Sequence, residues 1–408
     1  MATKYPILKK TKIDRTEGSV VRKMLDFLGE HYQITRNQFT KQVIAIHLDT
    51  GEQLSVDDIY IDMLESDIRF SLSNLKILFN SNRIEEVNPI REYFLNLKGK
   101  YSGVSQLDLL CSHFQARKFG DGINYADRKN RIMKKWLVSS VAQAIGLYIN
   151  EAAMILIDPV MGAGKSFFFE WLLKSTTELH DYYISSLDLK EIHDYNAAMA
   201  RYHLLNLDEM ANVKKGNVDE MKSLITKRTV VMKPKRGMQQ IQLPRISNVG
   251  GSTNYGQEAG GFLFQNDAGR RWACIELTGI DKEYSNVVDI HQLYAECLML
   301  IENNFDYKWN QEDYRDFEKY NKRYIIETPS MKYVRKHFAP TASKNGEFMS
   351  ASDIYSALVN NGVPANDKVK LSVTEIGKAM ISLNFIRDDV YQNTTKNNKS
   401  GYYVTKLN

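Results

Sequence analysis

The feature that most constrains this chain is a short apolar run followed by a glycine-containing loop and a second apolar segment. Ala152–Ile157 leads into Asp158-Pro-Val-Met-Gly-Ala-Gly-Lys-Ser, and Phe167–Leu173 continues with helical spacing. A strand, a loop that ends in Gly-Lys-Ser and a helix together form the context of a phosphate-binding loop. We predict that Gly162 and Gly164 let backbone N–H groups turn inward around phosphates, next to the positive end of the helix dipole.

Each residue of this loop has an expected role. Lys165 is expected to reach the β- and γ-phosphates of ATP, and the Ser166 hydroxyl to ligate Mg²⁺. The consensus has a glycine where this chain has Pro159, so the start of the loop is atypical. The predicted nucleotide-binding residues are Gly162, Ala163, Gly164, Lys165, Ser166 and Phe167.

A second apolar run ends in an acidic pair. Tyr202–Leu207 is followed by Asp208 and Glu209, and sequence with helical spacing separates this run from the phosphate loop. Alone, such a run indicates only the end of a strand. After a phosphate loop it also suits ATP hydrolysis, so we expect Asp208 to hold Mg²⁺ through water and Glu209 to polarise the attacking water.

Polar residues follow a third predicted strand and precede a fourth. Arg245–Asn254 reads as a strand with a polar tip, and Asn254 is expected to orient water beside the γ-phosphate. Arg270 and Arg271 come just before another predicted strand, Trp272–Leu277. Either arginine could neutralise charge in the transition state as an arginine finger, and the alternative is a surface pair that caps a turn.

Basic residues cluster between the acidic pair and the third strand, although the net charge of +5 is only mildly positive. A block of this kind is a candidate phosphate-binding surface, and the alternative is the solvated face of a hairpin. From Thr226 to Arg245 the chain has no acid and carries Lys227, Arg228, Lys233, Lys235, Arg236 and Arg245.

Composition excludes several classes of protein. Hydrophobic residues make up 43% and charged residues 25%, as in globular proteins, so a disordered or fibrous chain is not expected. Three widely spaced cysteines exclude a disulfide scaffold and suit a reducing compartment. The most apolar stretch, Trp136–Ile157, is interrupted by polar residues. We therefore expect a cytoplasmic protein with no membrane partner.

Metal catalysis finds no support in the sequence, because no metal-ligand signature of histidines or paired cysteines is present. Asp57, Asp58 and Asp62 could suggest the two-metal site of a primase. They fit better as the polar start and face of a surface helix, in which Ser55 is the N-cap.

The chain divides into four predicted regions. Residues 1–130 mix short strands and helices and predict an N-terminal α+β domain, with a strand at 42–48 and helices at 55–64 and 72–79. Residues 131–280 alternate strands and helices, which predicts a parallel sheet covered on both faces. Residues 281–340 form a helical extension, whose aromatic side chains are expected in the core.

The last region, residues 347–408, predicts a winged helix after a polar linker at 339–346. Two helices, at 352–360 and 372–383, precede strands at 385–391 and 401–406. The second helix could lie in a DNA major groove with Lys396 and Lys399 on phosphates, or pack against the neighbouring domain.

These motifs together resemble the virulence-associated protein E family of P-loop ATPases. That family is related to superfamily 3 helicases and to the helicase part of poxvirus-type primase-helicases, within the AAA+ class. The resemblance implies an α/β P-loop AAA+ core and covers roughly residues 90–280. It rests on Lys135–Ala142, Leu207–Glu209, Ser223–Thr229, Gly251–Asn254 and Asp267–Trp272.

The resemblance implies a DNA-dependent ATPase, namely a replicative helicase of a phage, plasmid or integrated mobile element. Family members form rings, so a hexamer is implied in which each site borrows Arg270 or Arg271 from the next subunit. The segment Val230–Gln242 corresponds to a hairpin that points into the central channel. Lys233, Lys235 and Arg236 at its tip would then contact the backbone of single-stranded or forked DNA.

Two classes of function remain open from the sequence. One is a ring-forming, ATP-driven DNA helicase, and the other is an initiator that binds a replication origin and uses ATP only to lock an assembly on DNA. An initiator could dispense with Glu209, so the presence of Glu209 favours the motor.

Overall fold

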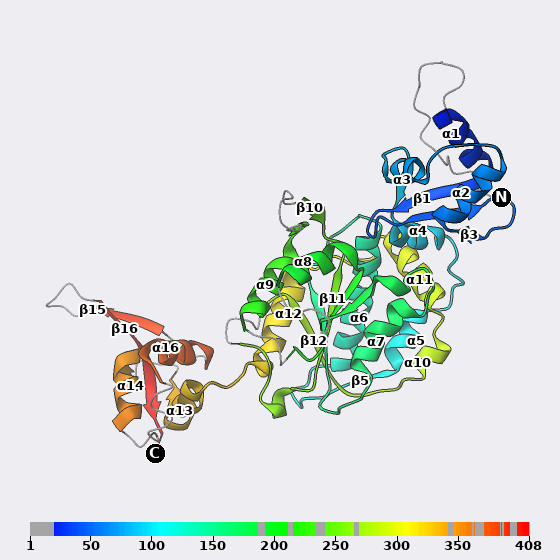
Figure 1. Ribbon diagram of the computed structural model, residues 1–408. Helices are drawn as coiled ribbons and strands as arrows, with labels where there is room; N and C mark the ends of the chain where they lie inside the picture. The colour runs from blue at the N-terminus through cyan, green and yellow to red at the C-terminus, as the bar shows by residue number, and fades with distance from the viewer. Residues whose placement is uncertain are drawn as a thin grey trace.

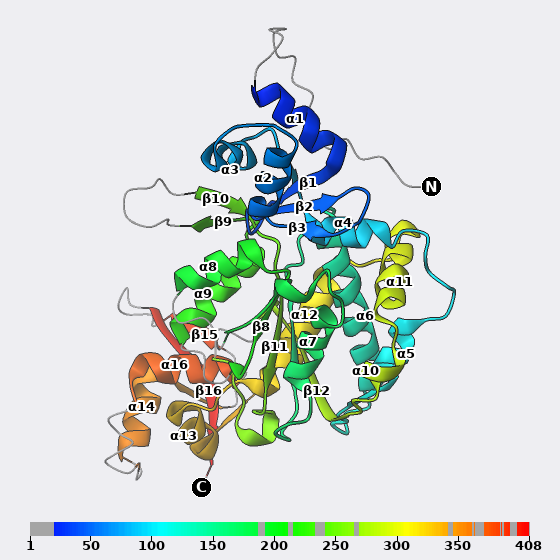
Figure 2. The ribbon, with the colours of Figure 1, turned by 45° about the vertical axis from the view of Figure 1, so that its right-hand side comes forward.

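A six-stranded sheet lies at the centre of the molecule, with a smaller α/β unit at each end (Figures 1 and 2). The computed structural model describes residues 20–186, 192–210, 215–232, 241–264, 269–341, 346–360, 363, 371–383, 385, 387–391 and 398–407. Within these ranges, no helix is both long enough and apolar enough to cross a lipid bilayer.

The central sheet has the strand order β5-β12-β6-β11-β8-β7. All neighbouring strands are parallel except β5, which runs antiparallel to β12. The parallel sheet predicted for residues 131–280 is therefore present. Its strands are β5 (Phe114–Ala116), β6 (Ala153–Ile157), β7 (Tyr183–Ser185), β8 (Leu204–Leu207), β11 (Asn248–Thr253) and β12 (Trp272–Ile280).

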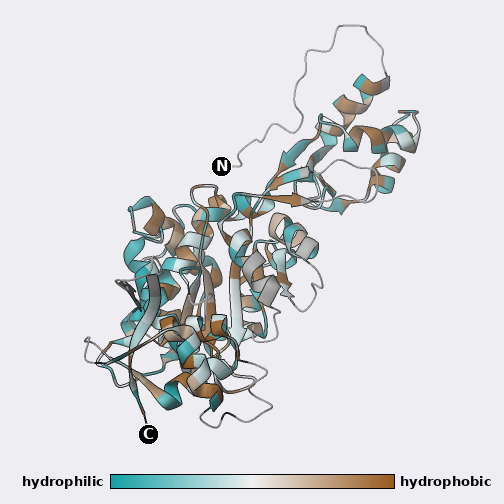
Figure 3. Ribbon diagram, turned by 90° about the vertical axis from the view of Figure 1, so that its left-hand side faces the viewer, coloured by the Kyte–Doolittle hydropathy of each residue, from teal (hydrophilic) through white to brown (hydrophobic). Residues whose placement is uncertain are grey.

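Strand β6 is buried along its whole length, and its residues alternate between two layers of helices. Met154 and Leu156 pack with the helices of one face, whereas Ile155 and Ile157 pack with those of the other. Figure 3 shows the hydrophobic residues of these central strands. Helices α6 (Tyr125–Ala144), α7 (Lys165–Lys174) and α11 (Ile290–Glu302) cover the first face, and α8 (Ile192–Arg201), α9 (Lys215–Thr226) and α12 (Gln311–Asn321) contribute to the second.

Strand β11 contains two consecutive glycines because neighbouring side chains leave no room for a Cβ atom. A Cβ on Gly250 would lie 2.3 Å from Cε1 of Phe169, which belongs to α7. A Cβ on Gly251 would lie 2.8 Å from Cδ1 of Ile155. Close packing of α7 on the sheet therefore depends on these two positions.

We expect Gly250→Ala to lower the free energy of unfolding by about 3 kcal/mol, because Phe169 and α7 must move to accept the methyl group. Gly279→Ala is the matched control, since a Cβ there would lie 3.6 Å from Oε1 of Gln115, an ordinary contact. Denaturant unfolding of both variants measures the difference. Equal stability of the two variants would contradict the packing described here.

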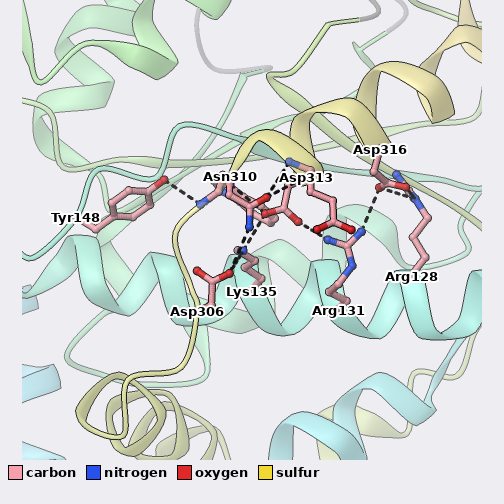
Figure 4. A network of polar contacts seen from close by, with 10 residues as sticks. Arg128, Arg131, Lys135, Tyr148, Asp306, Asn310, Asp313 and Asp316 are labelled. Atoms are coloured by element: carbon pink, nitrogen blue, oxygen red, sulfur yellow. Dashed lines mark hydrogen bonds and ion pairs between the residues drawn. The ribbon is translucent and has the colours of Figure 1, made fainter.

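The α6–α12 contact holds the helical extension against the central unit through a network of ion pairs (Figure 4). Asp313 binds Lys135 at 2.8 Å and also binds Arg131, and Asp316 binds Nε of Arg128 at 2.9 Å. The aromatic residues expected in the core of this region are buried at Trp309, Phe317, Tyr320 and Tyr324 and partly buried at Tyr307 and Tyr314. This region also contains α10 (Tyr284–Val287) and η5 (Lys322–Tyr324). A further short helix, η4 (Gln257–Ala259), precedes the region in sequence.

The N-terminal unit has its own sheet, in the order β3-β2-β1-β4, and its own core. The strand and helices expected from the sequence are present. Ser55 caps its helix as predicted, because Asp58 completes a capping box. The elements are α1 (Val20–His31), β1 (Tyr32–Asn37), β2 (Val43–His47), β3 (Gln53–Leu54), α2 (Val56–Glu65), α3 (Leu72–Asn80) and β4 (Glu85–Val87).

The predicted limit between residues 130 and 131 falls inside α6. Helices α4 (Pro89–Asn96) and α5 (Gln106–Ser112) pack with the core of the central unit, and β5 belongs to the central sheet. The packing therefore favours a central unit that begins near residue 89, because these apolar side chains are buried by the central helices. The division into four domains stays a prediction.

The C-terminal unit contains the predicted pair of helices and pair of strands, around a separate core. Part of the predicted linker differs: Ala339 and Pro340 lie in a strand, because this segment pairs with the last strand of the chain. The winged-helix interpretation stays a prediction, and Lys396 lies outside the described residues. The elements are α13 (Pro329–His337), β13 (Phe338–Pro340), β14 (Glu347–Met349), α14 (Ala351–Asn360), α16 (Val373–Ser382), β15 (Arg387–Tyr391) and β16 (Asn398–Lys406).

Candidate functional site

The carboxyl ends of β6, β8 and β11 meet at one edge of the central sheet. Thr253 of β11 pairs with Ile157 of β6, and Gly251 pairs with Leu207 of β8. The segments that follow these strands therefore emerge side by side. In open α/β sheets this edge is where ligands usually bind.

The loop between β6 and α7 uses left-handed backbone at both glycines. Gly162 has a φ of 75° and Gly164 a φ of 100°, a conformation that other residues rarely adopt. Gly164 is the N-cap of α7, and no side chain caps the helix there. The first N–H groups of a helix have no acceptor within the helix, so those of α7 can bind an anion.

Lys165 is buried, and its ammonium group is surrounded by oxygen acceptors. Nζ donates to the carbonyl oxygens of Asp158 at 2.8 Å and Val160 at 3.2 Å, and to Oδ1 of Asn254 at 2.7 Å. Burial lowers the pKa of Lys165, and the charges of Asp158 and Asp208 oppose that shift. The contact with Asn254 places the tip of β11 beside the loop.

Ser166 and Asp208 are in direct contact. The Ser166 hydroxyl donates to Oδ1 of Asp208 at 2.6 Å, and the Ser252 hydroxyl donates to the same oxygen. Within the described ranges, no three His, Cys, Asp or Glu side chains gather to hold a metal ion by themselves. A hydroxyl beside one carboxylate nevertheless suits Mg²⁺, which takes one or two protein ligands together with phosphate oxygens and water.

Glu209 is exposed at the end of β8, and its backbone is unusual. Its φ of 50° is left-handed, and its N–H donates to Oδ1 of Asp208 at 3.2 Å. Asp208 is held in turn by the hydroxyl of Ser186, which accepts its N–H at 3.0 Å. A non-glycine residue in this conformation costs about 1 kcal/mol or more, and such strain is common at functional sites.

Arg270 and Arg271 lie at the opposite edge of the sheet. The carbonyl of Arg271 accepts the N–H of Ala153 at 2.8 Å, at the start of β6, whereas the predicted phosphate loop follows the end of β6. The four residue steps between Ala153 and Ile157 span about 13 Å. Arg271 lies 3.7 Å from Glu151, and Arg270 lies over the ring of Tyr314. The structure therefore does not bring either arginine to the phosphate loop of its own chain.

The basic block is only partly described. Lys233, Lys235 and Arg236 lie outside the described residues, between β9 (Thr229–Met232) and β10 (Ile241–Pro244), which pair in antiparallel fashion. Arg245 is 2% exposed and donates to three backbone carbonyl oxygens, those of Lys227, Ser247 and Asn150. Its guanidinium group is therefore engaged within the fold, and Arg245 is not part of an exposed hairpin face.

Two contributors to the site were missed by the sequence analysis. Lys282 Nζ donates to the carbonyl of Gly162 at 3.0 Å, and its side chain lies over Gly164. Ser252 joins Ser166 at Asp208. A lysine just after a strand carries no motif, so only the three-dimensional structure reveals Lys282. Ser252 stood within the strand predicted at 245–254, but its role there depends on register.

A family model, the virulence-associated protein E-like domain, matches residues 100–326, more than half of the 408-residue chain. The chain belongs to the virulence-associated protein E-like domain family. In this virulence-associated protein E-like chain the matched range includes all of the predicted nucleotide-binding and catalytic residues, from Gly162 to Arg271. No curated protein matches the sequence.

The virulence-associated protein E-like chain is also similar to solved structures of the C-terminal region of NrS-1. The apo structure of residues 305–718 has a TM-score of 0.48 and 11% sequence identity, and the match covers 96% of this chain and 100% of that one. An apo structure of the same region in its A form has a TM-score of 0.46 and 11% identity, covering 94% and 98% of the two chains.

Proposed function

We propose that this protein is an ATP-dependent DNA helicase that serves the replication of a phage or other mobile genetic element. The observation that carries the proposal is the meeting of Lys165, Ser166, Asp208 and Asn254 at the carboxyl edge of the sheet. A cation, a hydroxyl, a carboxylate and an amide beside a glycine loop are the groups that phosphoryl transfer from a nucleotide requires.

In this proposal the chain binds ATP through residues 162–167. Lys165 exchanges its carbonyl partners for phosphate oxygens, and the N–H groups at the start of α7 hold the same phosphates. Ser166 and Asp208 would hold Mg²⁺, which neutralises charge on the β- and γ-phosphates when it is bound. Glu209 polarises the attacking water, and Asn254 orients that water.

The positions of Arg270 and Arg271 support an arginine finger that acts between subunits. They lie across the sheet from the phosphate loop, so either could serve only the site of a neighbouring copy. A ring, proposed here as a hexamer, provides such a neighbour to every subunit. Lys233, Lys235 and Arg236 are proposed to track single-stranded or forked DNA in the channel of that ring.

The experiment that tests the proposal is strand displacement on a forked DNA duplex, with ATP and Mg²⁺, together with sedimentation of the protein in the presence of nucleotide. We expect strand separation and a ring-sized assembly. ATP hydrolysis and DNA binding without strand separation would instead favour an ATP-gated initiator that binds a replication origin.

Lys282 provides a separate test of the loop. Because its ammonium group already lies at the phosphate loop, we expect it to contact a bound phosphate, and Lys282→Ala to weaken ATP binding by about tenfold. Lys319→Ala is the control, since Lys319 is exposed on α12. Titration with a fluorescent ATP analogue measures both. Equal affinity of the two variants would show that Lys282 does not take part in binding.

A further inference from the structure

A cavity of about 650 Å³ lies away from the nucleotide site, between the N-terminal unit and the central unit. Its walls come from segments far apart in the sequence. Phe39 contributes from the turn after β1, Arg91 from α4, Tyr148 and Glu151 from the segment before β6, and Arg228 from the start of the β9–β10 hairpin. Because Glu151 precedes β6, the cavity lies at the edge of the sheet opposite the phosphate loop.

Positive charge dominates the cavity. Arg91, Arg228 and Lys308 line it from three separate segments and are exposed, and none of them forms an ion pair within the described part of the chain. Glu151 is the one acid among the lining residues, and it already faces Arg271 at 3.7 Å. Three cations without acidic partners around one cavity favour an anionic ligand.

Buried Arg245 adds a fixed positive charge to the wall of the cavity. Burial lowers the pKa of Arg245 to about 10, so the group is still protonated at neutral pH. Its three hydrogen bonds go to neutral carbonyl oxygens, and the charge of Glu151 lies near it. No acid is therefore in direct contact with this guanidinium group among the described residues.

Two aromatic side chains give the cavity flat surfaces that are held in place. The hydroxyl oxygen of Tyr148 accepts the backbone N–H of Trp309 at 3.3 Å, next to Lys308 (Figure 4). Phe39 packs edge-on against Tyr182, with ring centroids 5.9 Å apart. Cations together with fixed, half-buried aromatic rings are what proteins use to bind the phosphates and bases of an unpaired strand.

We propose that this cavity binds a segment of single-stranded nucleic acid, with phosphates on Arg91, Arg228 and Lys308 and a base against Tyr148. The proposal deepens the proposed function, because it rests on DNA as the partner. The root of the β9–β10 hairpin supports this choice, since Arg228 and Pro244 line the cavity and the predicted DNA-contacting residues lie between those two strands in sequence.

The test is equilibrium binding of a fluorescein-labelled thymidine oligonucleotide, measured by fluorescence anisotropy over a range of salt concentrations. The proteins are the full chain, the double variant Arg91→Ala/Arg228→Ala, and the control Arg22→Ala/Arg69→Ala. The control removes the same charge from exposed arginines of the N-terminal unit that lie outside the cavity. Thermal unfolding of each variant verifies that it is folded.

We expect the cavity variant to bind about tenfold more weakly than the control, with the slope of log affinity against log salt reduced by about 1.4, or 0.7 for each lost phosphate contact. Tyr148→Phe, which keeps the ring, is expected to bind more tightly than Tyr148→Ala, because a base stacks on the ring. Equal affinity and slope in the two double variants would overturn the proposal.

Competition with a mononucleotide distinguishes binding of a strand from binding of a free nucleotide. Thymidine monophosphate at a concentration equal to that of the oligonucleotide should leave the complex intact, and displacement by it would overturn the assignment to a strand. The assay contains no ATP, so its result does not depend on hydrolysis. Absence of ATP turnover would contradict the proposed function alone. DNA binding that is unchanged by the substitutions in the cavity would contradict this inference alone.

Discussion

Replacing Lys165 with alanine is expected to lower ATP turnover by about 100-fold or more, because no other side chain of the loop places a cation among the phosphates. The substitution also removes the donor to three oxygens, those of Asp158, Val160 and Asn254. We expect nucleotide binding to weaken as well, since Lys165 is proposed to contact phosphates in the ground state and in the transition state. Steady-state phosphate release measures turnover, and titration with a fluorescent ATP analogue measures binding.

Lys174→Ala is the matched control for this prediction. Lys174 lies at the end of the same helix, is partly exposed, and pairs with Glu170 at 2.6 Å, so its loss removes the same charge from α7 outside the site. An exposed pair of this kind contributes little to stability. Turnover that falls equally in both variants would mean that α7, and not the ammonium group of Lys165, determines activity.

Glu209→Gln is expected to separate binding from hydrolysis. A glutamine keeps the size of the side chain but cannot accept a proton from water, so turnover should fall by about 100-fold or more. ATP affinity should stay near that of the wild type, because Lys165, Ser166 and the loop are unchanged. Single-turnover hydrolysis and nucleotide titration together measure the two effects.

The control for this substitution is Glu318→Gln, an exposed glutamate of α12. It removes one negative charge outside the site and should leave turnover unchanged. A Glu209→Gln variant that hydrolyses ATP as fast as the wild type would contradict the role assigned to the acidic pair. Loss of nucleotide binding would instead indicate that Glu209 supports the structure of the site, where its left-handed backbone is held by Asp208.

The central unit could be predicted from sequence because its signals are local. Apolar runs that end in polar residues identify β6, β8 and β11, and parallel pairing then requires their carboxyl ends to meet. This reasoning predicted Lys165 and Asn254 at the γ-phosphate and Ser166 and Asp208 at Mg²⁺. In the structure Asn254 contacts Lys165, and Asp208 contacts Ser166. The glycines of this loop also indicate its backbone conformation, because Gly162 and Gly164 both have a left-handed φ.

Other features depend on contacts between distant segments. Arg245 ends a stretch of basic residues that is typical of an exposed surface. It is nevertheless buried, because its guanidinium group donates to the carbonyl of Asn150. Pro340 reads as part of a linker, yet it joins an edge strand through pairing with Val404 near the end of the chain. The cavity between the two units is formed by residues from 38 to 308, so no local pattern could indicate it.

The central claim is that DNA controls ATP hydrolysis at the edge formed by β6, β8 and β11. The most direct test is ATP turnover by the wild-type protein with Mg²⁺, measured with and without single-stranded DNA and repeated on Lys165→Ala. The account predicts turnover that rises when DNA is added and is lost in the variant. Tight binding of nucleotide and DNA by the wild type without turnover would contradict it.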